Sequence, residues 1–217
     1  MNYGFDYMHY TNQQIKDLNR VRRLNIINSV SGIKPVNLIG TISDKDQLNL
    51  AIFSSVVHLG SDPALLGFIM RPTGDVPRHT YENIKSTGVY TINHVQQSII
   101  KKAHYTSAKV NRGVSEFDAC NLTAEFLNEF KAPFVNESQL KMGMKLVDEI
   151  PIPINGTVMM VGEIQHLYLP DVAVADNGWI NLETAHGVGI SGLNSYYQLK
   201  QIDSFPYARP HEIPDFE

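Results

Sequence analysis

Short runs of apolar and β-branched residues, separated by turn-prone polar segments, constrain the fold of this chain more than any other feature. Seven such runs occur, at residues 34–43, 48–60, 64–70, 89–95, 122–130, 139–150 and 156–169. The segments SDKDQ and GSDP divide the first three runs, and APFVNE and PIPING interrupt the later ones. Because each run has the length and composition of a strand, most of the core must come from β-structure.

Helices are predicted at only three places. Thr11 and Gln14 form a capping-box pattern that opens a helix over residues 11–31, with Gly32 as its C-cap. Its apolar positions recur every three to four residues and should dock as one stripe: Ile15, Leu18, Val21, Leu24 and Ile26 or Ile27. A short helix opened by Thr80 ends at Gly88, and residues 96–107 also have a helical pattern.

Regular strand spacing with short turns and few helices favours a closed or sandwiched antiparallel sheet over a parallel α/β sheet. The predicted class is therefore mainly β with peripheral helices. A length of 217 residues, without repeats or linkers, fits one domain over residues 1–217.

The amino-acid composition limits which binding partners the protein is expected to have. Charged residues make up 18% of the chain and apolar residues 43%, against about 25% charged in an average domain, which suggests that a partner covers part of the surface. A net charge of -4 without basic runs argues against nucleic acid as a ligand.

The sequence also predicts where the protein is located. The N-terminus lacks a signal-peptide pattern and no apolar stretch approaches the ~20 residues of a membrane span, so we expect a cytoplasmic protein. Cys120 is interpreted as a packing residue.

Several motifs that could carry other chemistry fail in context. The glycines of GVGISG are followed by only 25 residues with three prolines, too few for a dinucleotide-binding βαβ unit. Eight histidines show no metal-ligand spacing, so no metal site is expected. No Gly-x-Ser-x-Gly elbow is present, and paired Asp148 and Glu149 are interpreted as solvated surface.

One polar, cationic cluster remains in the Pro/Gly-rich loop before the short helix. It comprises Arg71, Arg78, His79 and Thr80. Cationic side chains, a hydroxyl and the free N–H groups of a helix N-terminus together suit a phosphate monoester. A solvated loop with a threonine N-cap explains the same residues equally well.

These ordered segments resemble the flavin reductase-like family of FMN-binding split barrels over residues 34–209, with the helix at 11–31 as an N-terminal extension. KPVNLIGTIS and NLAIFSSV are similar to the family's opening hairpin. GSDPALLGFIM resembles its Ser-x-Asp-Pro-Pro strand, and RHTYENIKSTGVYTIN resembles its Lys-Asp-Thr-x-x-Asn-Ile segment. SGLNSYYQL and YARP match the C-terminal turn. The resemblance implies an antiparallel, Greek-key-like split β-barrel that forms a homodimer with FMN between its subunits.

The resemblance also implies the site residues. Arg71, Arg78, His79 and Thr80 are assigned to the phosphate and ribityl end of FMN. The ring would be bordered, largely by backbone and small polar groups, by Asn49, Leu50, Ala51, Ser54, Ser55 and Asn93. His104 and Tyr105, with Tyr196 and Tyr197, are assigned to closing the site, from either subunit. An exposed helix-end histidine and half-buried interface tyrosines are the alternatives.

Arg78 and His79 stand where the family has Lys and Asp, Ala64 replaces a Pro, and Ile52 replaces another. Arg78 keeps the positive charge. FMN is favoured over FAD because no second phosphate cluster exists.

Three functions remain open from the sequence. The first is an NAD(P)H-dependent flavin reductase that supplies a monooxygenase or another acceptor. The second is a flavoredoxin-like protein that keeps FMN and passes electrons on, and the third is a non-catalytic flavin-binding dimer. No acid/base group is predicted because hydride transfer is the chemistry of the cofactor itself.

Overall fold

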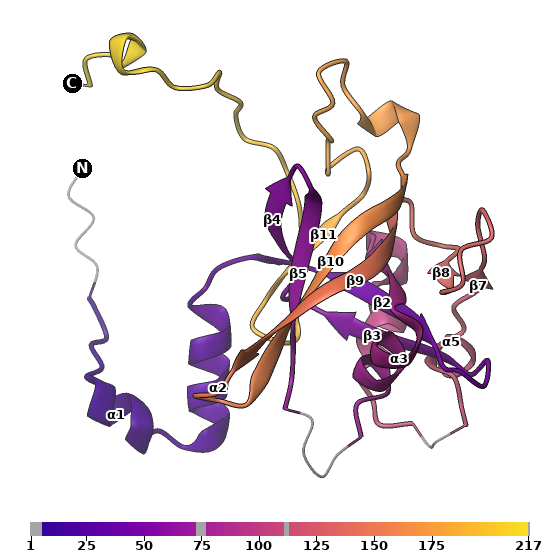
Figure 1. Cartoon of the computed structure of the whole chain (residues 1–217). Coiled ribbons are helices and arrows are strands. Elements are labelled where there is room, and N and C mark those ends of the chain that lie inside the picture. The colour runs from indigo at the N-terminus through magenta and orange to yellow at the C-terminus, as the bar shows by residue number, and fades with distance from the viewer. Residues whose placement is uncertain (1–5, 73–76, 111–112, 217) are drawn as a thin grey trace.

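A seven-stranded antiparallel sheet forms the body of the computed structural model, which describes residues 6–72, 77–110 and 113–216 (Figure 1). Its strand order is β3-β2-β6-β9-β10-β5-β4. The strands are β2 (Asn37–Ile42), β3 (Leu48–Phe53), β4 (Val57–Ser61), β5 (Ala64–Met70), β6 (Val89–His94), β9 (Lys141–Ile152) and β10 (Thr157–Tyr168).

The sheet curls into a barrel because its two edge strands are consecutive in the chain. Phe53 ends β3 and Val57 begins β4, so these residues lie within about 14 Å of each other even across a fully extended link. A flat seven-stranded sheet would hold its edges roughly 29 Å apart. The Ser55 hydroxyl accepts a hydrogen bond from the Ile69 amide at 3.0 Å, and the Phe53 and Phe68 rings meet at 5.1 Å. The predicted run 48–60 is therefore two strands, one at each edge of a split barrel.

Two small sheets flank the barrel. β1 (Lys34–Pro35), β11 (Val188–Ser191) and β12 (Ser195–Gln198) form one, and β7 (Ala124–Glu125) pairs with β8 (Phe134–Val135). The glycines of GVGISG thus lie on and beside a short strand, without a dinucleotide-binding unit.

The helices are peripheral, as predicted. Those beside the barrel are α3 (His79–Thr87), α4 (Ile100–Tyr105) and α5 (Glu116–Ala119), of which α5 was not predicted, and 3-10 turns occur at Gln97–Ile99, Asp171–Ala173 and Pro210–Glu212. Gly88 ends α3 in the left-handed conformation with φ of 72°, which explains the glycine there. None of the helices in the described ranges is long and apolar enough to cross a membrane.

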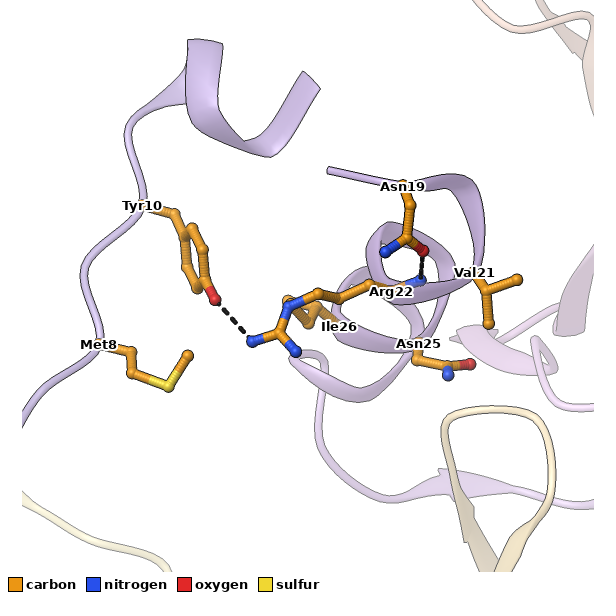
Figure 2. Close-up of a pocket in the computed structure, with 7 residues that line it drawn as sticks. All are labelled: Met8, Tyr10, Asn19, Val21, Arg22, Asn25 and Ile26. Carbon is orange, nitrogen blue, oxygen red and sulfur yellow. Dashed lines mark hydrogen bonds between the residues drawn. The ribbon is translucent and has the colours of Figure 1, made fainter. Parts of the chain in front are cut away.

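The N-terminal region corrects one prediction. The capping box of Thr11 and Gln14 is present, but it opens α1 (Asn12–Asp17), and a second helix, α2 (Arg20–Ser29), follows. Asn19 breaks the helix because its side chain accepts a hydrogen bond from the Arg22 amide at 2.9 Å and so caps α2. The apolar stripe does not dock, since no residue of either helix is buried. Arg22 instead reaches the Tyr10 hydroxyl at 2.9 Å (Figure 2).

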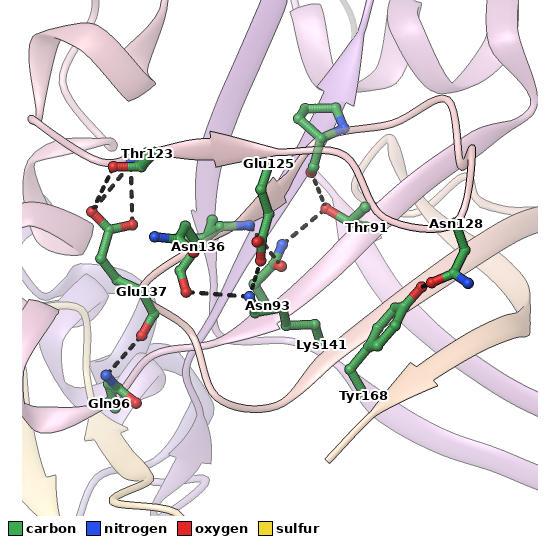
Figure 3. Close-up of polar contacts among 12 residues, drawn as sticks. Thr91, Asn93, Gln96, Thr123, Glu125, Asn128, Asn136, Glu137, Lys141 and Tyr168 are labelled. Atoms are coloured by element: carbon green, nitrogen blue, oxygen red, sulfur yellow. Dashed lines mark hydrogen bonds and ion pairs between the residues drawn. The ribbon is translucent and has the colours of Figure 1, made fainter. Parts of the chain in front are cut away.

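Residues 122–130 form a strand only at β7, which corrects the prediction of a full strand there. Asn128 and Glu129 have φ of 50° and 59°, which bends the backbone out of an extended path. Polar contacts hold the segment instead (Figure 3). The Tyr168 hydroxyl donates to Asn128 at 2.7 Å, and Lys141 forms an ion pair with Glu125.

The two larger parts of the core lie on opposite faces of β2 and β6, and a small third cluster contains Phe130, Ala132 and Phe134. Side chains alternate along a strand. Ile39 and Ile92 thus face the barrel interior, where they meet Phe68, Tyr90 and four buried methionines. Leu38 and Leu50 face outward and pack under α4, α5 and β11. This double burial specifies the register, because a one-residue slip would exchange the two faces.

Two polar side chains interrupt the apolar interior. Asn37 and His94 are directly opposite on β2 and β6, so their side chains share a face. Asn37 is fully buried and, among the described residues, neither polar atom of its side chain has a hydrogen-bond partner. Burial also lowers the pKa of His94 from 6.5 to about 4, because the charged imidazolium loses its hydration.

The shifted pKa of His94 predicts acid sensitivity. Between pH 6.5 and 4 the unfolded chain binds a proton at His94 that the folded chain excludes, so the free energy of unfolding should fall as pH falls through this window. The contribution is present in full above the unfolded pKa and amounts to on the order of 1–3 kcal/mol. Urea unfolding from pH 7.5 to 4.5 measures it. His94→Gln should flatten the profile, and the exposed control His211→Gln should not; an unchanged profile in His94→Gln contradicts the assignment.

Candidate functional site

A buried cluster of hydroxyl and amide groups fixes α3 against the barrel. The Asn49 side-chain amide donates to the Thr41 hydroxyl at 3.1 Å and to the Thr80 hydroxyl at 3.0 Å. Asn83 donates to the same Thr41 oxygen at 3.1 Å. All four residues are buried. Thr80 therefore points into the body and is not the N-cap that the sequence suggested, because its hydroxyl is already engaged with β3.

Arg78 occupies the N-cap position of α3, and no side chain of the described residues caps this helix. The first amides of a helix have no acceptor within it. Arg78 donates through Nε to the Pro72 carbonyl at 3.2 Å, which keeps the end of β5 and exposed Arg71 near the helix start. His79 is half-buried in the first turn. Arg78 and His79 thus lie at a helix start that no side chain caps, which is an arrangement that suits an anion. Residues 73–76 lie outside the described ranges.

A mainly polar cavity of about 640 Å³ adjoins this cluster, a volume within the range of small-molecule sites. His79, Asn49 and Asn83 line one side of it, and the β2–β3 turn from Ser43 to Gln47 lines another. The cavity lies beside the barrel end at which α3 begins.

The outer edge of β3 brings the predicted ring-bordering residues together on one strand. Asn49 and Ala51 face the barrel side, and Leu50 faces the opposite core. The Leu50 amide points outward and donates to the Glu116 carboxylate at 3.0 Å. Glu116 is itself buried, so α5 supplies an acceptor where another strand would lie. Ser54 and Ser55 follow in the half-buried link that closes the barrel.

Asn93 lies apart from the β3 edge, and its side chain is committed to the fold. Its amide donates to the Leu38 carbonyl at 3.1 Å and to the Thr91 hydroxyl at 2.9 Å, and its oxygen accepts from the Val135 amide at 3.0 Å (Figure 3). Thr91 in turn donates to the Pro133 carbonyl at 2.6 Å. Asn93 therefore joins β2, β6 and β8.

The predicted site-closing residues His104 and Tyr196 lie together although they are distant in sequence. Nδ1 of His104 and the Tyr196 hydroxyl share a hydrogen bond of 3.0 Å between α4 and β12. Burial raises the pKa of Tyr196, which keeps the phenol protonated. Tyr105 and Tyr197 beside them are exposed.

The interpretation of Glu149 is wrong. Glu149 is not plain solvated surface, because it accepts from the Tyr81 hydroxyl at 2.9 Å and pairs with Lys85, tying α3 to β9. The Glu149 carboxylate also raises the pKa of Tyr81. Within residues 6–72, 77–110 and 113–216, no three His, Cys, Asp or Glu side chains are grouped as metal ligands.

Sequence reasoning missed Thr41 and Glu116. Thr41 lies directly opposite Asn49 in the β2–β3 hairpin. The turn predicted at residues 43–47 sets this pairing, so Thr41 could have been predicted as a neighbour of Asn49. No spacing signal indicates Glu116, because the contact joins residues 66 positions apart.

Comparison with solved structures identifies the architecture as the split barrel of flavin reductases. A candidate flavin reductase with split barrel domain from Shewanella frigidimarina NCIMB 400 is 48% identical, with a TM-score of 0.90 over 93% of this chain and 100% of that chain. Nitrilotriacetate monooxygenase component B from Bacillus cereus is 16% identical, with a TM-score of 0.82 over 93% and 100%. Flavoredoxin of Desulfovibrio vulgaris (Miyazaki F) is 19% identical, with a TM-score of 0.70 over 82% and 92%. The latter two likenesses concern the fold alone.

Residues 32–181 match the family described as flavin reductase like domain, and the chain belongs to this family. The predicted family and fold class are confirmed.

The Glu116 contact predicts a local stability effect. Glu116→Ala leaves the buried Leu50 amide without its acceptor, which should lower the free energy of unfolding by about 1–3 kcal/mol. Glu116→Gln keeps an oxygen acceptor and should lose less. Hydrogen exchange at the Leu50 amide, followed by NMR, should accelerate in Glu116→Ala. Equal protection in both variants would show that the contact does not hold the β3 edge.

Proposed function

We propose that this protein binds FMN and reduces flavin with a nicotinamide nucleotide. The observation that carries the proposal is the uncapped, cationic start of α3 beside the β3 edge, in a chain that belongs to the flavin reductase-like family. Neither feature alone defines the ligand, but together they favour a flavin with one phosphate group.

The residues present fit the phosphate of FMN. A phosphate monoester carries nearly two negative charges at neutral pH and several strong acceptor oxygens. Arg71 and Arg78 supply positive charge, and the first amides of α3 supply donors directed out of the helix. His79 would add a further donor. Thr80, whose hydroxyl bonds Asn49, would contribute its backbone amide more readily than its side chain.

The flavin ring would lie along the β3 edge, bordered by Asn49, Ala51, Ser54 and Ser55. The amide of Leu50 and the side chain of Asn93 already have partners, so these two residues would shape the site without bonding the ring. His104 and Tyr196 would close the ring end, in one subunit or across two.

Bound FMN supplies hydride transfer to and from its ring. The protein's own part is to hold the phosphate at α3, orient the ring on β3 and exclude water. The family membership supports a homodimer that delivers electrons to a monooxygenase or another acceptor.

Anaerobic titration separates this function from its alternatives. We expect NADH or NADPH to bleach the visible absorbance of stoichiometric FMN on the purified protein within seconds. Rapid bleaching with one nucleotide also identifies the donor. If FMN binds and neither nucleotide bleaches it, a flavoredoxin-like carrier or a non-catalytic flavin-binding dimer replaces the reductase. If FMN does not bind, the site assignment itself is wrong.

The phosphate assignment predicts a selective loss of affinity. Arg78→Gln should weaken FMN binding by on the order of tenfold, equivalent to about 1.4 kcal/mol, because one charge-assisted contact to the phosphate is lost. Riboflavin, which lacks the phosphate, should bind Arg78→Gln and the unchanged protein equally. Fluorescence quenching measures both affinities, with exposed Lys101→Gln as the charge-matched control. An equal loss for both flavins would place Arg78 away from the phosphate.

A further inference from the structure

The N-terminal helices form an arm that stands off the barrel (Figure 1). We define the arm as residues 8–29. Its base is fixed, because the Lys34 ammonium donates to the Asn28 carbonyl at 2.8 Å and to the Gly192 carbonyl at 2.9 Å. The arm is thus held by the turn after β11, while its helices bury no residue against the barrel.

Large apolar side chains of the arm are exposed to solvent. Val21 is 67% and Ile27 48% exposed, and Val30, the residue after α2, is 75% exposed. Helices of six and ten residues are marginal in water unless an apolar face packs on something. Within the described residues, Val21, Ile27 and Val30 remain exposed.

A pocket of about 660 Å³ opens between the irregular segment before α1 and α2 itself (Figure 2). Met8, Val21 and Ile26 give it apolar walls, and the hydrogen bond between Arg22 and Tyr10 crosses it. We call it the arm pocket. Its walls suit a segment that combines aromatic and acidic side chains.

The C-terminal tail, residues 200–216, has that composition. Ile202 is 97% exposed, Phe205 80% and Tyr207 86%, and a single 3-10 turn is its only regular structure within residues up to 216. A polar tail could remain solvated, but large apolar side chains at this density favour burial. Figure 1 shows the tail leaving the barrel beyond β12 and running outward.

Arm and tail have opposite charge. Helices α1 and α2 carry four basic residues and one acidic residue, whereas residues 200–216 carry Asp203, Glu212 and Asp215 against Lys200 and Arg209. Arg209 is engaged by Glu212 at 3.2 Å. Among the described residues, no hydrogen bond or ion pair joins the tail to α1 or α2 of its own chain.

We infer that the tail of a second copy of this chain occupies the arm pocket, with its aromatic side chains against Met8, Val21 and Ile26 and its carboxylates near Arg20 and Arg22. Two-fold symmetry repeats the contact, so each subunit gives one tail and receives one. The inference rests on the proposed homodimer, but not on flavin reduction. In this arrangement the arm and the tail both form contacts between the subunits.

Charge reversal tests the contact. Arg20→Glu with Arg22→Glu reverses the arm, and Asp203→Lys with Asp215→Lys reverses the tail. Each double variant should weaken the dimer by on the order of tenfold in sedimentation equilibrium, because like charges then meet at both contacts. Exposed Lys101→Glu with Lys109→Glu is the charge-matched control for the arm variant. These residues lie outside the buried core, and far-UV circular dichroism checks that the fold is retained.

Mixing the two reversed variants distinguishes exchange from an intrachain contact. If the tail binds the partner's arm, each mixed dimer restores both contacts, and native mass spectrometry with one mass-tagged variant should find mixed dimers in excess of random pairing. In a contrary outcome, the dimer constant recovers only in a variant that carries all four changes in one chain, and mixing the two double variants gives no excess of mixed dimers. The tail then binds its own arm. That result overturns the inference, as does a monomeric protein or an unchanged dimer constant. This experiment measures dimer composition, whereas the proposed function is tested by flavin absorbance. Each proposal can therefore fail independently of the other.

Discussion

The three-residue link between β3 and β4 is the constraint on which the rest of the structure depends. It joins the two edges of a seven-stranded sheet, so the sheet must curl until Ser55 reaches Ile69 and Phe53 reaches Phe68. Closure creates one interior, which the methionines of β9 and β10 fill, and leaves the outer faces of β2 and β3 for a second core. A split barrel with two hydrophobic layers follows from this single short connection.

Closure also decides where the candidate site lies. The barrel end near Thr41 is sealed by the polar cluster of Asn49, Thr80 and Asn83, which orients α3 across it. Because Thr80 is drawn inward, no side chain of the described residues caps α3, and its first amides remain beside Arg78. The same hydrogen bonds that stabilise the barrel end thus leave the helix start available to an anion.

The barrel buries its large apolar side chains, whereas the arm and the tail leave theirs exposed. Within the barrel, Leu38 and Ile39 are fully buried on opposite faces of one strand. In the arm and the tail, Val21 and Phe205 remain open to solvent in a single chain. Under the proposed exchange of tails, folding of the body and association of two copies would bury different surfaces.

Much of the fold could be predicted from the local sequence. Alternation and turn residues predicted the strands, the Thr11 capping box and Gly88 predicted helix boundaries, and ordered motifs identified the family, because each depends on neighbours in the chain. Tertiary structure alone decided the Glu116 contact to Leu50 and the meeting of His104 with Tyr196, whereas the break at Asn19 and the bend at Asn128 are local features that the prediction missed. The two long-range contacts require the closed barrel to bring distant segments together, and the helix break and the bend reflect local backbone choices that the apolar pattern does not encode.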